Sequence, residues 1–160
     1  MPKYRLLTKE ELTALEKEFV EYLVLNGITA EDWQKMKKED ISKAEYTIEL
    51  FSDVVFESIL RKTKFIEHRG KNFLRIFQCL SEKLVLVAME ANEEEGVNFN
   101  DPAFLNLATA NPPKSLSVYT ANKPFTRNRE IEVFEMLQTG CVITDDKLFK
   151  TLSLIMANHQ

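Results

Sequence analysis

Three carboxylates spaced four residues apart are the first feature of this sequence that could do chemistry. Glu49, Asp53 and Glu57 fall on one face of a helix predicted over about residues 43–61, and His68 follows soon after it. Carboxylates and an imidazole can bind Mg²⁺ or Mn²⁺, so the row is a candidate site for a metal-dependent hydrolase. The sequence lacks the second Glu-x-x-His pair of helical di-metal sites, and a polar ridge that meets solvent or lysines explains the row equally well. We therefore expect a structural row and no metal.

Six basic residues lie close together after this helix and could bind phosphate groups. They are Arg61, Lys62, Lys64, Arg69, Lys71 and Arg75. Phe65 and Phe73 are interleaved among them, and aromatic rings stack on bases, so this segment could bind RNA or single-stranded DNA. Lysines at a strand edge also discourage edge pairing, which is the structural alternative. The net charge of −4 gives no support to a dominant nucleic-acid footprint.

Residues suited to nucleophilic catalysis are few. The chain has two cysteines, Cys79 and Cys141, and two histidines. His68 could partner either thiol, but neither cysteine lies in a Cys-x-x-Cys pair or a local cysteine-protease signature. The sequence contains no Gly-x-Ser-x-Gly elbow and no glycine-rich phosphate loop. We therefore expect two free, buried thiols, no cofactor and a non-catalytic protein.

Composition points to one cytoplasmic globular domain. Of the 160 residues, 44% are hydrophobic and 29% are charged, which is ordinary for a soluble protein. The N-terminal segment lacks the apolar stretch of a signal peptide, and no apolar run approaches the ~20 residues that span a bilayer. Glycine and proline are few, which favours helices over a sandwich of many turns. The sequence predicts a single α+β domain over residues 1–160, with no membrane association.

The predicted helix over about 43–61 is the element around which the rest should pack. Its main apolar stripe consists of Ala44, Ile48, Phe51, Val55 and Ile59. Leu50 and Val54 widen the stripe, so the helix is apolar over most of its surface. Such a helix is usually covered by other elements, and we expect it at the centre of the fold.

Capping signals mark the helices around it. Capping boxes at Thr8 and Ser42 predict the starts of a helix over about 9–26 and of the central helix. Thr29 begins a short helix that ends near Lys38. Further helices are expected over about 102–111, 129–137 and 144–157.

A small, mostly antiparallel sheet should occupy the middle of the chain. Its expected strands are about 63–69, 73–80, 84–90 and 115–121. The second and third are apolar runs separated by a hairpin-length break, although one long helix also fits their spacing. Because these runs are apolar on both faces, we expect a central strand pair covered on one side by helices.

Four segments resemble an uncharacterised family of small Bacteroidetes proteins. They are Lys3-Tyr-Arg-Leu-Leu-Thr-Lys-Glu-Glu-Leu12, Leu25-Asn-Gly-Ile28, Glu49-Leu-Phe-Ser-Asp-Val-Val-Phe56 and Lys62-Thr-Lys-Phe-Ile-Glu-His-Arg69. The resemblance covers roughly residues 1–90. It implies a bacterial cytoplasmic protein and carries no catalytic residue across.

By elimination, the sequence favours a non-catalytic protein-interaction or accessory module whose partner is another protein. The acidic loop at 93–95, the Pro112-Pro113 segment and the terminal helices are its candidate surfaces. RNA or single-stranded nucleic-acid binding through residues 61–75 is the first alternative, and a metal-dependent hydrolase is the second. The sequence predicts neither the identity of the partner nor the oligomeric state.

Overall fold

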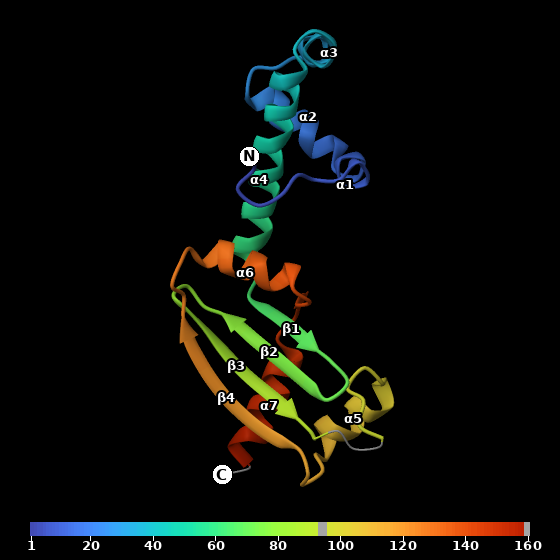
Figure 1. The fold of residues 1–160 in the computed structure, drawn as a ribbon, viewed down its shortest axis with the longest axis vertical. Helices are drawn as coiled ribbons and strands as arrows, with labels where there is room; N and C mark the ends of the chain where they lie inside the picture. Colours follow the sequence, from blue (N-terminus) through green and yellow to red (C-terminus); the bar gives the residue numbers. More distant parts are fainter. Residues whose placement is uncertain (93–95, 159–160) are drawn as a thin grey trace. The chain divides into compact units, whose positions relative to one another are not determined.

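The computed structural model describes residues 1–92 and 96–158. In these residues the chain forms seven helices and a five-stranded antiparallel sheet (Figure 1), which confirms the predicted α+β class. The chain divides into two compact units, residues 1–61 and 62–160. The single domain expected from the chain length stays a prediction. The acidic loop at 93–95 and His159 lie outside the described residues.

Four helices build the first unit. They are α1 (Lys9–Ala14), α2 (Glu16–Leu25), α3 (Ala30–Glu39) and α4 (Ile41–Lys62). Capping boxes are present at Thr8 and Thr29, where each threonine side chain accepts a hydrogen bond from the backbone N–H three residues on. Within the described residues, no helix combines the length and apolarity needed to cross a lipid bilayer.

Two predictions about helix ends are wrong in this unit. The helix expected over 9–26 is divided at Leu15, whose backbone leaves the helical conformation with φ −103° and ψ 22°. The capping box expected at Ser42 is absent, because α4 has already begun at Ile41. Asp40 caps this helix instead, since its Oδ1 accepts from the backbone N–H of Lys43 at 3.2 Å.

The buried side of α4 forms the core of the first unit. Phe51 is only 2% exposed, and its ring lies 4.9 Å from that of Phe19 and 5.3 Å from that of Tyr22, between centroids. Leu50 and Val54 are 40% and 52% exposed. The main apolar stripe is therefore buried around Phe51, but its last member, Ile59, is 43% exposed, and the residues expected to widen the stripe are exposed as well.

The second unit is built on the sheet. Its strands are β1 (Phe65–Arg69), β2 (Phe73–Cys79), β3 (Lys83–Glu90), β4 (Ser117–Pro124) and β5 (Val142–Thr144), in the spatial order β4-β3-β2-β1-β5. The hairpin of β2 and β3 is confirmed, and its rival, one long helix, is excluded. The fifth strand was not predicted. It is only three residues long and depends on pairing with β1.

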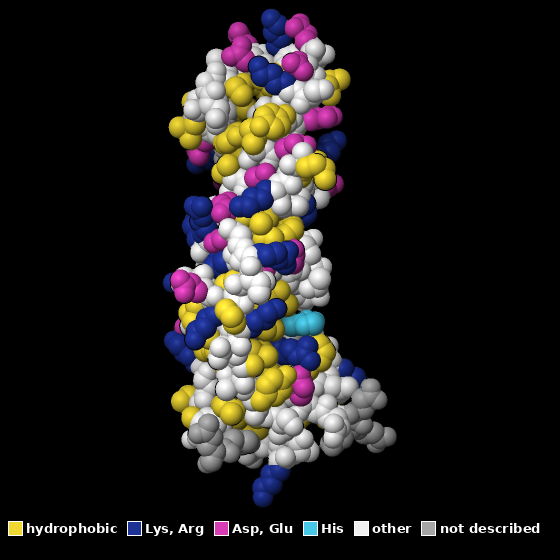
Figure 2. Space-filling view, turned by 60° about the vertical axis from the view of Figure 1, so that its left-hand side comes forward, with side chains coloured by type: hydrophobic (Ala, Val, Ile, Leu, Met, Phe, Trp, Pro, Cys, Tyr) yellow, Lys and Arg dark blue, Asp and Glu magenta, His cyan; other side chains and the backbone are white. Residues whose placement is uncertain are grey.

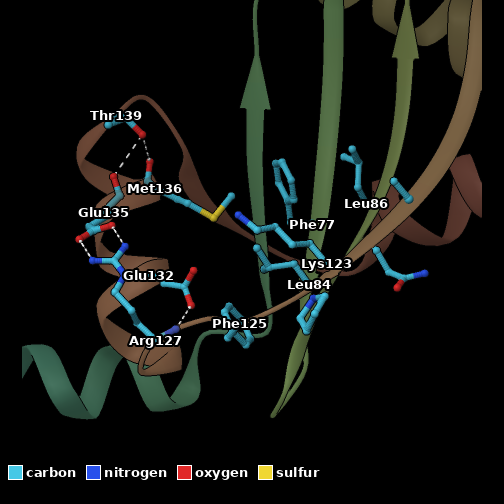
Figure 3. Close-up of a pocket in the computed structure, with 13 residues that line it drawn as sticks. Phe77, Leu84, Leu86, Lys123, Phe125, Arg127, Glu132, Glu135, Met136 and Thr139 are labelled. Carbon is cyan, nitrogen blue, oxygen red and sulfur yellow. Dashed lines mark hydrogen bonds and ion pairs between the residues drawn. The ribbon is translucent and has the colours of Figure 1, made fainter.

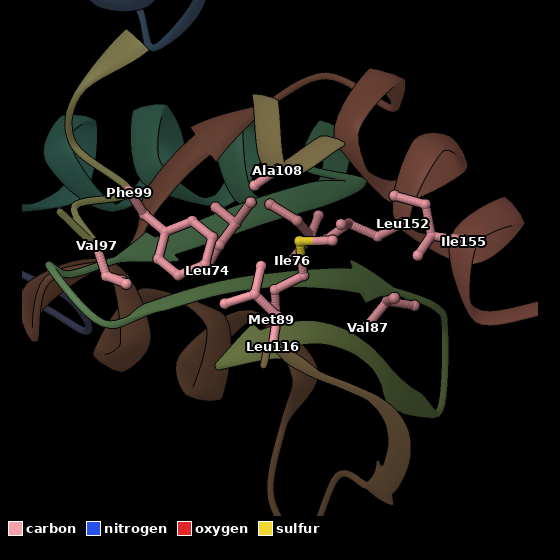
Figure 4. Packing of buried hydrophobic residues seen from close by; sticks show 10 residues of the cluster. All are labelled: Leu74, Ile76, Val87, Met89, Val97, Phe99, Ala108, Leu116, Leu152 and Ile155. Atoms are coloured by element: carbon pink, nitrogen blue, oxygen red, sulfur yellow. The ribbon is translucent and has the colours of Figure 1, made fainter. Parts of the chain in front are cut away.

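One face of this sheet carries the main hydrophobic cluster, which also includes residues of α5 (Pro102–Ala110) and α7 (Lys147–Asn158) (Figure 4). The buried members are Leu74, Ile76, Val87, Met89, Val97, Phe99, Ala108, Leu116, Leu152 and Ile155. The opposite face is partly covered by α6 (Arg129–Gln138). Helices thus lie on both faces of the sheet, so the expectation of cover on one side is wrong.

Candidate functional site

The carboxylate row on α4 binds the N-terminal segment of the chain. Asp53 accepts hydrogen bonds from the backbone N–H of Lys3 at 2.8 and 2.9 Å and from that of Tyr4 at 3.2 Å. Glu57 accepts from the Tyr4 hydroxyl and from the Lys3 ammonium. The hydrogen bond from Tyr4 is the main cause that lowers the pKa of Glu57. Glu49, Asp53 and Glu57 share the predicted face, and all three contact the N-terminal segment, since the Glu49 carboxylate pairs with the Met1 ammonium at 3.5 Å.

His68 belongs to the second unit, on β1. Its ring packs edge-on against Phe73, with centroids 4.9 Å apart. Its Nε2 faces Gly140, where a Cβ would lie 3.2 Å away. Among the described residues, no group of three histidine, cysteine or acidic side chains is close enough to hold a metal ion. The structure therefore gives His68 a packing role.

The six basic residues of segment 61–75 differ in whether they have acidic partners. Three have acidic partners, in the pairs Arg61–Glu57, Arg69–Glu67 and Arg75–Glu90. Lys62, Lys64 and Lys71 are exposed and make no ion pair within the described chain. Lys64 precedes β1 and Lys71 follows it, so a rise of about 3.3 Å per residue places the backbones of these two lysines roughly 20 Å apart.

The two aromatic residues of the same segment are engaged within the second unit. Phe65 packs on Phe149 of α7, with ring centroids 5.3 Å apart. Phe73 carries the guanidinium of Arg75 at 4.3 Å from its ring centroid. Both rings therefore already contact protein groups on at least one face or edge.

Both cysteines are free and buried, as the sequence predicted. Burial raises the pKa of the Cys79 thiol to about 11, and burial also raises that of Cys141. The thiolate is the nucleophilic form of cysteine. At neutral pH both thiols are therefore protonated, and neither is a reactive nucleophile.

A pocket of about 540 Å³ lies between α6 and the sheet face opposite the hydrophobic cluster (Figure 3). Its floor is apolar, because Phe77, Leu86 and Ala121 stand opposite one another across three neighbouring strands. Leu84 extends the floor, and Met136 of α6 forms part of the wall. The remaining lining residues are Asn122, Lys123, Pro124, Phe125, Arg127, Glu132, Glu135 and Thr139.

Most of the charged side chains at the pocket rim form hydrogen bonds or ion pairs with one another. The guanidinium of Arg127 donates to both carboxylate oxygens of Glu135, and its backbone N–H donates to Glu132 at 3.0 Å. The pKa of Glu135 is lowered by its hydrogen bond from Arg127. The Lys123 side chain makes no hydrogen bond or ion pair with the part of the chain that the structure describes. The rim therefore offers one available cation.

Helix α6 is fixed over the pocket by its first residue. The guanidinium of Arg129 donates to the backbone carbonyls of Leu80 at 2.9 Å and Cys79 at 3.0 Å, and to that of Thr63. Asn128 caps the helix, since its Oδ1 accepts from the backbone N–H of Ile131. These contacts tie the start of α6 to the ends of β2 and the β2–β3 turn.

Sequence reasoning missed this pocket. The strand predicted over about 115–121 stops short of Lys123 and Pro124, and no role was predicted for Phe125 or Arg127. One signal was present, because the run from 84 to 90 is apolar on both faces. A strand of that kind needs cover on its second face as well, and α6 supplies part of it.

Comparison with known proteins places the chain in one family. No curated protein and no solved structure matches it significantly. The sequence model of a family matches residues 1–157. The match confirms the resemblance to an uncharacterised family and extends it well beyond the first ninety residues. The chain belongs to DUF6495, a family of unknown function.

Proposed function

We propose that this protein is a non-catalytic protein-interaction module, and that the pocket between α6 and the sheet binds a bulky apolar side chain of a partner protein. The observation that carries the proposal is the open apolar floor formed by Phe77, Leu84, Leu86 and Ala121. Its volume is within the range of about 300–1,000 Å³ that is typical of binding pockets. Apolar area removed from water would supply the binding energy.

The charged residues at the rim of the pocket indicate which residue types the partner segment should contain. Lys123 is exposed at one side of the apolar floor and has no acidic partner in the described chain. Glu132 and Glu135 are held by Arg127 and do not compete for it. We therefore expect the apolar anchor of the partner to lie beside an aspartate or glutamate that pairs with Lys123. A charge pair at such a rim contributes more to specificity and association rate than to affinity.

Selection from a random peptide library displayed on phage tests this proposal. We expect a consensus with a bulky apolar residue next to an acidic one. A synthetic peptide of that sequence should bind Ala121→Trp, which fills the pocket, and Lys123→Glu at least tenfold more weakly than wild type by fluorescence polarisation. Ser117→Trp is the matched control, because it adds the same side chain to the same strand outside the pocket. Absence of a consensus, or equal binding by Ala121→Trp, would overturn the proposal.

Two other functions have weaker support. Nucleic-acid binding would rely on Lys62, Lys64 and Lys71, because the three arginines of that segment already have acidic partners. A metal-dependent hydrolase would need Asp53 and Glu57 to release the N-terminal segment. A cytoplasmic location fits the two free thiols, since reducing compartments keep cysteines in that form.

A further inference from the structure

Strand β4 has a free outer edge. Among the residues that the structure describes, it is the terminal strand of the sheet and pairs only with β3, and Figure 1 shows no labelled element of residues 62–160 beyond it. Most of its residues are exposed. Native sheets usually protect such an edge with charges, bulges or a covering segment. The stretch 117–122, Ser-Val-Tyr-Thr-Ala-Asn, carries no charge at all.

The hydrogen-bond pattern identifies which backbone groups point outward. The N–H of Phe125 donates to the carbonyl of Glu82 at 3.0 Å, so this pair belongs to the hydrogen-bonded set between β3 and β4. Because bonded and non-bonded pairs alternate in an antiparallel ladder, every second residue of β4 bonds to β3. These residues are Ser117, Tyr119, Ala121 and Lys123. The alternate residues, Val118, Thr120 and Asn122, direct their N–H and C=O groups away from the sheet.

We propose that a second copy of this chain pairs its β4 antiparallel to this one, about a two-fold axis at Thr120. The outward row is centred on Thr120, and Pro124, which has no N–H, ends it on one side. Under this axis Val118 meets Asn122 of the second copy, Thr120 meets its own equivalent, and each pair exchanges two hydrogen bonds. Two five-stranded sheets then become one continuous sheet with two-fold symmetry.

The side chains suit this self-pairing. Thr120 faces Thr120 of the second copy, and threonine pairs are favourable across antiparallel strands. Tyr119 falls opposite Ala121 of the second copy, so a large side chain stands beside a small one where strands approach most closely. Lys123 falls opposite Ser117 of the second copy, so no like charges meet. This complementarity favours a second copy over an unrelated peptide as the occupant of the edge.

Sedimentation velocity across a concentration series is the first measurement. A single edge pairing buries less than the ~1,200 Å² of a standard interface, so we expect a weak dimer that forms in the micromolar range. Thr120→Pro should abolish it, because the proline removes an outward N–H without breaking a bond to β3. Thr120→Val should still dimerise. Both variants lose the hydrogen bond from the Thr120 hydroxyl to the Leu86 carbonyl, so their difference isolates the outward backbone group.

A charge exchange tests the axis itself and does not depend on proline being tolerated. Thr120→Lys and Thr120→Glu should each be monomeric, because each would place a like charge opposite itself. Mixed together, they should form a heterodimer at concentrations where neither self-associates. A wild type that stays monomeric up to millimolar concentration would overturn the proposal. A Thr120→Pro variant that still dimerises, or a mixture of the charged variants that stays monomeric, would overturn it as well. The inference does not rest on the pocket, because Thr120 is not among the residues that line it.

Discussion

Charged residues in this protein mainly hold segments of the chain in place. Asp53 binds the backbone of Lys3 and Tyr4. Arg129 binds the carbonyls of Cys79 and Leu80. Charge-assisted hydrogen bonds of this kind are about twice as strong as neutral ones. The residue types that suggested chemistry in the sequence therefore serve local architecture in the structure.

Glu11 gives the clearest pH dependence at the residue scale. Its hydrogen bond from Arg5, followed by that from the Thr8 backbone, lowers its pKa to about 2. A carboxylate whose pKa is lowered by folding stabilises the native state above its unfolded pKa of about 4.3. That stabilisation is lost as the pH falls from there toward about 2. Because the side chain is 37% exposed, solvent screening makes the effect modest.

Glu11→Gln should therefore be less stable than wild type at pH 7, and the difference should shrink as the pH falls below 4. Urea denaturation at several pH values measures it. Glutamine can keep part of the capping box, so the comparison isolates the charge. Glu21→Gln, at an exposed position of α2, is the control and should show no such trend. A difference for Glu11→Gln that stays constant with pH would contradict the assignment.

Neighbouring residues on α4 give a direct test of its buried side. Phe51→Ala should lower the free energy of unfolding by about 3–5 kcal/mol, because it removes a buried ring and leaves a cavity. Leu50→Ala changes the adjacent residue, which is 40% exposed, and should cost much less. Thermal and urea unfolding measure both. Equal losses of stability would show that α4 is covered on both sides.

At the scale of elements, the Arg129 side chain ties the start of α6 to the end of β2. A guanidinium donates in several fixed directions, whereas a lysine ammonium is a point charge that cannot reproduce this fork. Arg129→Lys should therefore destabilise the protein by about 1.5–3 kcal/mol, the usual value for hydrogen bonds to charged groups. Arg127→Lys alters an exposed ion pair and should destabilise the protein much less, because solvent screens such pairs. The prediction fails if the two variants have the same urea midpoint.

The local sequence pattern predicted some secondary-structure elements correctly but missed others. The strand predicted over about 115–121 and the hairpin-length break predicted between 80 and 84 correspond to β4 and to the β2–β3 hairpin. Strand β5 has no pattern of its own, because three residues next to β1 are ordered only by that pairing. The pocket could not be read from the sequence either. It brings Phe77 and Leu86 together with Met136, and only the folded topology places them side by side.

At the scale of the whole molecule, net charge and charge placement both weigh against a polyanion partner. The protein carries a net charge of −4, which repels nucleic acid at long range. The unpaired lysines Lys64 and Lys71 stand at opposite ends of β1. Few phosphates of one strand could contact them together.

We therefore expect no micromolar binding of labelled RNA or single-stranded DNA at physiological salt. Phosphate contacts release counterions, so weak binding at low salt should fall with a logarithmic slope of about −0.7 per contacted phosphate. Fluorescence anisotropy at two salt concentrations measures this. Tight binding at physiological salt that Lys64→Glu with Lys71→Glu abolishes would restore the nucleic-acid function. Arg69 is a poor choice for such a variant, because substituting it would leave the largely buried Glu67 without its ion-pair partner.

The contact between His68 and Gly140 limits how this sequence can vary. Gly140 has φ +115°, a conformation that other residues rarely adopt, and a Cβ there would approach His68 Nε2 to 3.2 Å. Gly27 also has a positive φ of 72°, but a Cβ there would meet nothing within 4 Å. Asparagine, which tolerates the left-handed conformation, is therefore an accessible substitution at Gly27. A side chain at position 140 would meet two obstacles, the strained backbone conformation and a contact that His68 must relieve by shifting, so evolution should keep glycine there more strictly than at position 27.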